Sequence, residues 1–247
     1  MVVTISSSKA EWVEFLDKIS AGNIVTNVVF IVKKDDKKIH IEEIAQDNTA
    51  IMKATWTPRL ISGEGEVTLS PEKIKRAIEA LPDAGLISGE FSEAVETFTG
   101  AKRYIKFKLP EKGDKKDISG MKKFDKHLVE LEIDAKAIET ILSKSISATG
   151  IDSPRYEFVY ENGVLTAKIG DFATDGNEMG FPLASSLAKG EGEEKFSSSF
   201  NDTIREVLKI GGKIKVSFGK DYPAKLVSKS QTVEIEYIIA PAVSKEG

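Results

Sequence analysis

Apolar residues in the first quarter of the chain follow two different periods. In SSSKAEWVEFLDKIS, Trp12, Phe15, Leu16 and Ile19 recur at the spacing of one helix face, behind serines that can cap the helix. Stretches rich in β-branched and aromatic residues lie before and after it, which is typical of strands. These stretches are VVTI, IVTNVVFIVK, KKIHIEE and AIMKATW. The pattern predicts a strand, an amphipathic helix and a meander.

A second helix is predicted after the strand GEVTL. Ser70 and Pro71 supply an N-cap and a proline at the first helical position, and Ile74 and Ile78 then share one face. Pro82 ends the helix. Three further strand candidates complete this half of the chain: LISGEF, VETFTG and RYIKFKL.

A polar, lysine-rich segment separates the two halves of the chain. Residues 110–127 contain a proline, two glycines and few apolar side chains, among them Ile118 and Met121. This composition indicates an exposed linker. We therefore expect an N-terminal domain over residues 1–109 and a C-terminal domain over residues 128–247.

The second half repeats the plan of the first. After the strand LVELEI, Asp134 can cap a helix, and the strands of YEFVYENGVLTAKIG and FSSSF precede a helix in NDTIREVLKIGG. In the first helix of each half, the matching apolar positions are 126 residues apart: Trp12 and Ile138, Phe15 and Ile141, Leu16 and Leu142. In the second helix of each half they are 130 residues apart: Ile74 and Ile204, Ala77 and Val207, Ile78 and Leu208. Two helices in nearly the same register indicate an internal duplication. The alternative is a chance agreement between amphipathic helices.

Composition narrows the possible chemistry. The 247 residues include no cysteine and two histidines, so thiolate nucleophiles and cysteine-ligated zinc are excluded, and we expect neither a metal site nor a cofactor. No apolar run reaches the length of about 20 residues that a membrane helix needs. The N-terminus also lacks the layout of a signal peptide. We expect a soluble, intracellular protein with no membrane partner, and its net charge of −4 does not by itself favour nucleic acid.

The order of these segments resembles the DNA sliding clamps of the proliferating cell nuclear antigen family. The resemblance is carried by VEIEYIIAPAV at the C-terminus, FGKDYPAKL before it, AQDNTAIMKATW in the first half and FSSSFNDTIREVLK in the second, and it covers essentially the whole chain. It implies an α+β fold of two similar clamp domains, each with two helices packed on antiparallel sheets, that assemble as a pseudo-sixfold ring. It also implies a non-enzymatic processivity factor that encircles duplex DNA and tethers replication and repair proteins.

A clamp of this kind needs basic side chains that face phosphates without reading bases. The resemblance implies that the four helices line the central hole. The candidate DNA-facing residues are Lys9, Lys18, Lys73, Arg76, Lys136, Lys144, Arg205 and Lys209. The alternative is that these side chains are ordinary solvated helix faces, since Glu11, Glu14, Asp17 and Glu79 share the same helices. A positive bore would reconcile DNA binding with an acidic outer surface.

The resemblance also implies a hydrophobic pocket for short partner peptides, between the linker and the C-terminal segment. Its candidate residues are Gln46, Ile118, Met121, Pro223, Ile238, Ile239, Ala240 and Pro241. Because successive strand residues face opposite sides, Ile238 and Ile239 cannot both point into one pocket. The implied partners are double-stranded DNA, DNA polymerase, a clamp loader, a flap nuclease and a ligase. The linker is more basic than is usual in the family, and QDNTA lacks bulky residues, so partner preference stays open.

Assembly and source follow from the same resemblance. Clamp subunits join edge strand to edge strand, so RYIKFKL would pair with the EMGFPLASS region of a neighbour, although Pro182 weakens the latter as a regular strand. A homotrimer is expected, and the alternative is a paralogue or viral clamp that works only in a hetero-oligomeric ring. The Lys- and Glu-rich composition without cysteine favours an archaeal source and the cytoplasm; a eukaryotic clamp would be nuclear.

An enzyme is the remaining alternative. Asp47, Asp171 and Asp175 are loop aspartates that could be imagined as a carboxylate site. No phosphate-binding loop or nucleotide fingerprint accompanies them. Loop aspartates usually cap turns, so we expect no catalysis.

Overall fold

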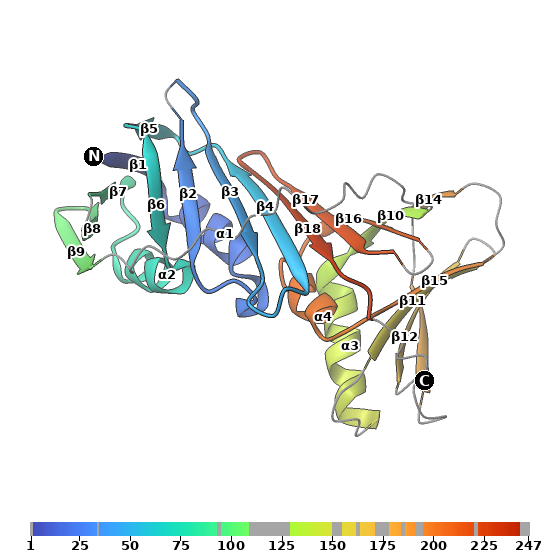
Figure 1. Ribbon diagram of the computed structural model, residues 1–247. Coiled ribbons are helices and arrows are strands. Elements are labelled where there is room, and N and C mark those ends of the chain that lie inside the picture. The colour runs from blue at the N-terminus through green and yellow to red at the C-terminus, as the bar shows by residue number, and fades with distance from the viewer. Residues whose placement is uncertain are drawn as a thin grey trace. The chain divides into compact units, whose positions relative to one another are not determined.

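The chain forms two compact units in the computed structural model (Figure 1). The residues that the structure describes are 2–33, 35–92, 95–108, 129–149, 155–161, 164–170, 178–183, 186–190, 195–219 and 222–242. The first unit comprises Met1–Gln46, Ile51–Ile118 and Lys229–Ile235, and the second comprises Asp47–Ala50, Ser119–Ser228 and Glu236–Gly247. The chain therefore contributes to each unit more than once.

Strands of the first half form two antiparallel groups. One is a five-stranded sheet in the order β5-β1-β7-β8-β9, and in the other the strands follow the order β4-β3-β2-β6. Their bounds are β1 (Val3–Ser8), β2 (Val28–Val32), β3 (Ile39–Ile44), β4 (Ala50–Trp56), β5 (Leu60–Ser62), β6 (Gly65–Leu69), β7 (Leu86–Phe91), β8 (Val95–Gly100) and β9 (Arg103–Lys108). Apart from the short strand β5, which pairs with β1, all of them were predicted.

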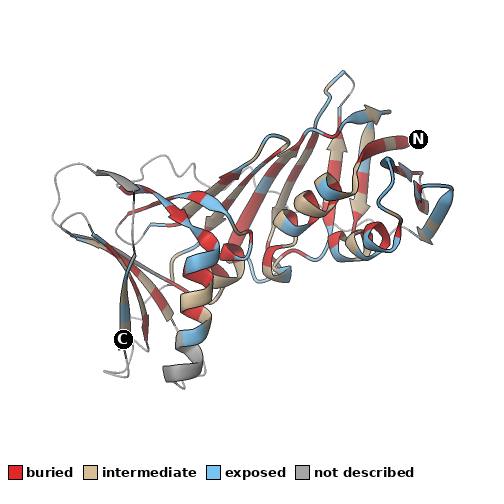
Figure 2. Cartoon of the chain, turned by 180° about the vertical axis from the view of Figure 1, so that it is seen from behind, coloured by how far each residue is buried: buried red, intermediate tan, exposed pale blue. Residues whose placement is uncertain are grey.

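The two predicted helices of this half are confirmed as α1 (Lys9–Ile19) and α2 (Pro71–Ala80), and a 3-10 turn, η1 (Ala21–Asn23), follows α1. Ser8 caps α1 through a capping box with Glu11. Pro71 opens α2, although the Ser70 side chain makes no capping hydrogen bond. Figure 1 and Figure 2 show the two helices side by side along the strands of this half, with buried and exposed residues alternating along them.

Aromatic side chains fill the core beneath α1. Trp12, Phe15 and Trp56 are fully buried, with ring centroids 4.6 Å apart for Trp12 and Trp56 and 4.3 Å apart for Phe15 and Trp56. The Trp12 indole N–H donates to the Ile87 carbonyl at 3.0 Å, which joins the helix to β7. Burial of rings this large supplies much of the stability of a unit of this size.

The second half also has two antiparallel groups of strands. Their orders are β13-β12-β11-β15 and β14-β10-β16-β17-β18. The bounds are β10 (Val129–Asp134), β11 (Arg155–Glu161), β12 (Val164–Gly170), β13 (Glu178–Leu183), β14 (Ser186–Gly190), β15 (Lys195–Phe200), β16 (Lys213–Phe218), β17 (Ala224–Lys229) and β18 (Val233–Ile239). Pro182 lies in β13 at the end of its sheet, a position where a missing N–H costs no ladder bond.

The helices of the second half are α3 (Ala135–Thr149) and α4 (Thr203–Leu208). Asp134 caps α3 as predicted, because its carboxylate accepts the Ala137 N–H at 3.1 Å. Ile138 and Leu142 of α3 and Ile204 and Leu208 of α4 are buried, so each helix is held by its apolar face. Their opposite faces carry the charged residues.

The strand orders of the two halves match term by term. In β5-β1-β7-β8-β9 and β14-β10-β16-β17-β18, each strand has a counterpart in the same place, and so have the strands of β4-β3-β2-β6 and β13-β12-β11-β15. A chance agreement between amphipathic helices would not extend to the order of the strands. The predicted α+β architecture, with two helices on antiparallel sheets in each half, is confirmed.

Candidate nucleic-acid interface

The basic residues of α1 are occupied within the first unit. Lys9 Nζ donates to the carbonyls of Glu79 and Leu81 at 2.7 Å each, which caps the C-terminal end of α2. Lys18 is mostly buried and pairs with Glu14 at 3.5 Å. Lys9 therefore joins α1 to the end of α2, and Lys18 pairs within α1.

The two predicted basic residues of α2 differ in their surroundings. Lys73 Nζ lies 3.5 Å from a buried carboxylate oxygen of Glu96, donates to the Lys108 carbonyl at 2.9 Å and lies over the Phe107 ring at 4.5 Å. Burial raises the pKa of Glu96, and the ammonium of Lys73 opposes that rise. Arg76, in contrast, is 76% exposed and pairs only with Glu72 of its own helix among the contacts that the structure describes.

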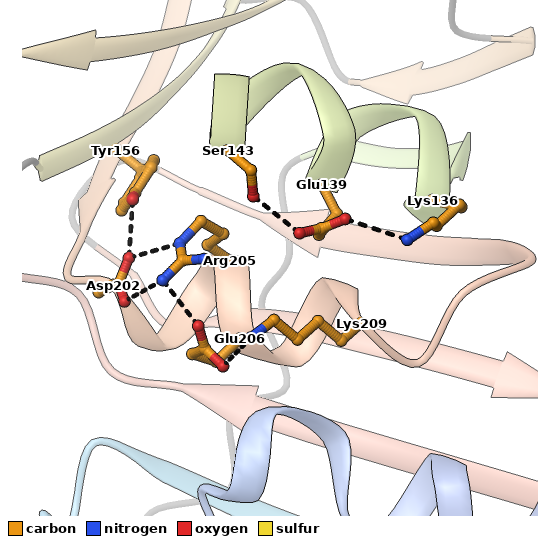
Figure 3. Close-up of polar contacts among 8 residues, drawn as sticks. All are labelled: Lys136, Glu139, Ser143, Tyr156, Asp202, Arg205, Glu206 and Lys209. Atoms are coloured by element: carbon orange, nitrogen blue, oxygen red, sulfur yellow. Dashed lines mark hydrogen bonds and ion pairs between the residues drawn. The ribbon is translucent and has the colours of Figure 1, made fainter. Parts of the chain in front are cut away.

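The polar faces of α3 and α4 carry alternating charges (Figure 3). We call this set the charge ladder; its members are Lys136, Glu139, Lys209, Glu206, Arg205 and Asp202. Arg205 donates to both oxygens of Asp202, at 2.8 and 2.7 Å, and lies 2.7 Å from Glu206. Lys209 binds the other oxygen of Glu206 at 2.5 Å. Glu206 thus bridges two cations.

Two hydroxyl groups donate to acidic members of the charge ladder. The buried Tyr156 hydroxyl donates to Asp202 at 2.7 Å, and Ser143 donates to Glu139 at 2.7 Å. Burial raises the pKa of Asp202, but the hydrogen bonds from Arg205 and Tyr156 outweigh burial and lower this pKa below its usual value. The Asp202 hydrogen bond in turn raises the pKa of Arg205. Both groups stay charged at neutral pH, so Asp202 and Arg205 form a full ion pair.

Basic and acidic residues are nearly balanced on the helices as a whole. The basic ones within α1 to α4 are Lys9, Lys18, Lys73, Lys75, Arg76, Lys136, Lys144 and Arg205. The acidic ones, one fewer, are Glu11, Glu14, Asp17, Glu72, Glu79, Glu139 and Glu206. Lys75 joins α2 to α1 through Asp17 at 2.5 Å. The helix surfaces are therefore close to neutral rather than strongly basic.

The exposed basic residues on these helices are the ones best placed to meet an anion. Arg76 and Lys136 are 76% and 72% exposed, and Lys144 is also exposed. Each projects from a helix whose apolar face is buried, so its charge is directed away from the core. Exposed cations of this kind can bind phosphates weakly and without base recognition.

The predicted peptide-pocket residues lie mainly at the C-terminus. Ile239 is fully buried, whereas Ile238 and Pro241 are partly exposed and Ala240 is exposed, so Ile239 is the core residue of that pair. The Ala240 N–H donates to the Thr49 carbonyl at 2.8 Å. Pro223 is buried, and Gln46 is exposed and donates to Thr26 at 2.8 Å. Ile118 and Met121 lie outside the described residues.

Of the three loop aspartates considered as a carboxylate site, the structure describes Asp47. Asp47 accepts the Thr49 backbone N–H at 3.0 Å and its hydroxyl at 2.7 Å, which is a turn-capping role. Asp171 and Asp175 lie outside the described residues. Across the part of the chain that the structure describes, no group of three or more acidic or histidine side chains could hold a metal ion. No described helix is long and apolar enough to cross a membrane.

Sequence reasoning noted Glu14 beside Lys18 but missed Glu96, Asp202 and Glu206 as acidic partners of the predicted cations. Glu206 and Asp202 had a readable signal, because opposite charges at i, i+3 and i+4 along one helix face attract each other. The Lys73–Glu96 pair had none, since the two residues come together only when α2 packs beside β8.

A duplicated chain of helix pairs on antiparallel strands, repeated in the same strand order, defines the DNA-clamp fold. No family model matches the chain, and no curated protein matches it. Solved structures do match. One is A. fulgidus PCNA bound to the C-terminal region of FEN-1, with 16% identity over 99% of this chain and 100% of that chain and a TM-score of 0.74. Another is the PCNA2–PCNA3 complex from Sulfolobus tokodaii, with 12% identity over 96% of this chain and 98% of that chain and a TM-score of 0.75. Entamoeba histolytica PCNA also matches, with 13% identity over 98% of this chain and 99% of that chain and a TM-score of 0.76.

The chain therefore has the fold of the PCNA clamps over nearly its whole length. The resemblance predicted from the C-terminal YIIAP segment and the duplication is confirmed at the level of the fold.

Proposed function

We propose that this protein is a DNA sliding clamp, a non-enzymatic processivity factor that encircles duplex DNA and tethers replication and repair proteins. The observation that carries the proposal is the end-to-end match, at 98–100% of the other chain's length, to three structures of PCNA. In this proposal, residues 110–127 connect clamp domains over 1–109 and 128–247.

Ring assembly would use the free ends of two sheets. β9 and β13 are each the last strand in their sheet, and an unpaired edge is a template for another chain. Pairing of β9 from one copy with β13 of the next would close a ring of three copies. One similar structure is a complex of two different PCNA chains, so a hetero-oligomeric ring is the second candidate.

Contact with DNA would come from the exposed helix faces. Arg76, Lys136 and Lys144 are the exposed candidates, while Lys9, Lys18, Lys73, Arg205 and Lys209 contribute to the field from paired positions. Dispersed contacts to phosphates give weak, sequence-neutral binding, which suits sliding.

Partner peptides would bind at the C-terminal segment. Ile238, Ala240 and Pro241 present apolar surface at the end of β18. One of the similar structures holds the C-terminal region of FEN-1 on its PCNA, which supports a peptide-binding role here. DNA polymerase, clamp loader, flap nuclease and ligase would be recruited through short motifs. The location would be the cytoplasm of an archaeon or the nucleus of a eukaryote.

The DNA-facing role is tested by replacing Arg76 and Lys144 with alanine together. We expect clamp-dependent synthesis by a partner polymerase on primed circular DNA to fall at least about threefold, because two exposed phosphate contacts are lost. The control replaces Lys213 and Lys215 of β16, two exposed lysines on strands, and should leave synthesis unchanged. Equal activity in all three proteins would contradict the assignment.

A further inference from the structure

The charge ladder leaves its cations already paired. Arg205 is only 20% exposed and Glu206 18%, so their ion pair is partly shielded from solvent. Lys209 is 41% exposed and is held at 2.5 Å by the same Glu206. A phosphate that approaches α4 must compete with this carboxylate for both cations. Shielded pairs resist such competition more than fully exposed ones.

From this geometry we propose that the acidic members of the charge ladder, Glu206 first among them, limit the affinity of the α3–α4 face for duplex DNA. The inference rests on the proposed function, in which this face meets DNA. The carboxylates compete with the DNA phosphates for the cations of the ladder, so the ring holds DNA loosely and moves along it. The ladder thereby sets the strength of the contact rather than its existence.

Glu206 is the decisive member because of what it touches. Among the described residues, its carboxylate makes ion pairs with Arg205 and Lys209. Asp202 also accepts the buried Tyr156 hydroxyl, so its removal would leave a buried donor unsatisfied. Glu139 lies on α3, pairs with Lys136 at 3.4 Å and accepts from Ser143. Glu206 can therefore be changed with the least damage to the fold.

The test compares Glu206→Gln with Glu130→Gln. Glu130 lies on β10 and pairs with Lys215 at 3.3 Å, so this control removes the same charge and the same kind of ion pair. The exposed Glu130 alternates with the buried Val129 and Leu131 on β10, which places it away from the core and the ladder. Glu139→Gln is a second ladder variant. Thermal unfolding by circular dichroism verifies that each protein is folded.

Binding is measured by fluorescence anisotropy with a fluorescein-labelled linear duplex of about 30 base pairs, whose open ends let rings thread without a loader. We expect Glu206→Gln to bind about threefold more tightly than wild type at 100 mM NaCl. The slope of log binding constant against log salt concentration should steepen by the amount that about one additional phosphate contact gives. Glu139→Gln should shift in the same direction, and Glu130→Gln should match wild type.

The outcomes separate the two proposals. Wild-type protein that neither binds the duplex at 50 mM NaCl nor stimulates a polymerase would overturn the proposed function. Wild-type binding with no difference between Glu206→Gln and Glu130→Gln would overturn the role of the ladder alone. Weaker binding by folded Glu206→Gln would also overturn it, because the glutamate would then be positioning the cations for DNA.

Discussion

Single side chains in this protein carry out tasks that their chemical type does not reveal. Lys9 closes the end of α2, and Lys73 is held by a buried carboxylate and an aromatic ring. A lysine on a helix is ordinarily assigned to solvent or ligand. Here the long side chain reaches backbone carbonyls and a neighbouring sheet, which the sequence cannot indicate.

The charge of Glu11 contributes to stability at the start of α1. Burial raises the pKa of Glu11, but hydrogen bonds outweigh burial and lower this pKa to about 2. They come from the Ser8 backbone N–H, the Ser8 and Ser7 hydroxyls and Arg59. Because this folded value is below the ordinary value of 4.5, the contribution of Glu11 is complete above pH 4.5 and lost as pH falls toward 2.

We expect Glu11→Ala to lower the free energy of unfolding by about 1–2 kcal/mol at pH 7, through the lost capping box and ion pair. The difference from wild type should shrink between pH 4.5 and 2 in urea unfolding followed by circular dichroism. Glu14→Ala is the control, since its i, i+4 pair with Lys18 is worth less than about 0.5 kcal/mol. A loss of the same size at pH 2.5 would exclude the charge as its cause.

At the scale of elements, the β8–β9 hairpin determines what the edge of the first sheet offers. Ala101 and Lys102 both have positive φ, at 49° and 65°, as a two-residue turn with the right twist requires. Such a turn closes on a hydrogen-bonded pair, Gly100 and Arg103, so alternate residues of β9 bond to β8. The backbone groups of Lys106 and Lys108 then point away from β8, and the Lys108 carbonyl meets Lys73.

We expect Lys106→Pro to prevent self-association, because it removes an outward N–H that a neighbouring strand would bind, without breaking the β8–β9 ladder. Sedimentation of the variant should show a monomer. Lys106→Ala keeps the N–H and should assemble like wild type. If the proline variant assembles as well as the alanine variant, β9 is not the joining edge.

Most elements could be predicted because their apolar periods are long and their caps are local. Ser8, Pro71 and Asp134 mark helix starts within a few residues of sequence. The short strands β5 and β14 were not foreseen, since three to five residues carry too little pattern. The Lys73–Glu96 ion pair depends on packing between α2 and β8, so the sequence could not indicate it, and the DNA-facing role of the helix cations stays a prediction.

For the molecule as a whole, the strand orders leave β9 of the first half and β13 of the second half among the strands at the ends of their sheets. These ends are different surfaces, so in the proposed assembly their pairing would join copies head to tail, and a rotation that closes would give a ring.

The molar mass in solution distinguishes a homotrimeric ring from a mixed ring. Light scattering on the purified protein should give about three times 27.0 kDa for a homotrimer. A lower mass that rises only when a second clamp chain is added would instead indicate an obligate mixed ring. A stable monomer under all conditions would contradict both.

The aromatic core beneath α1 has a practical consequence. Both tryptophans of the chain, Trp12 and Trp56, lie in the first unit, in contact with each other and fully buried. Tryptophan emission therefore follows the first unit alone, while far-ultraviolet ellipticity follows both. Coincident transitions would reveal cooperative unfolding of the duplicated halves, and separate ones would give each half its own midpoint without any added label.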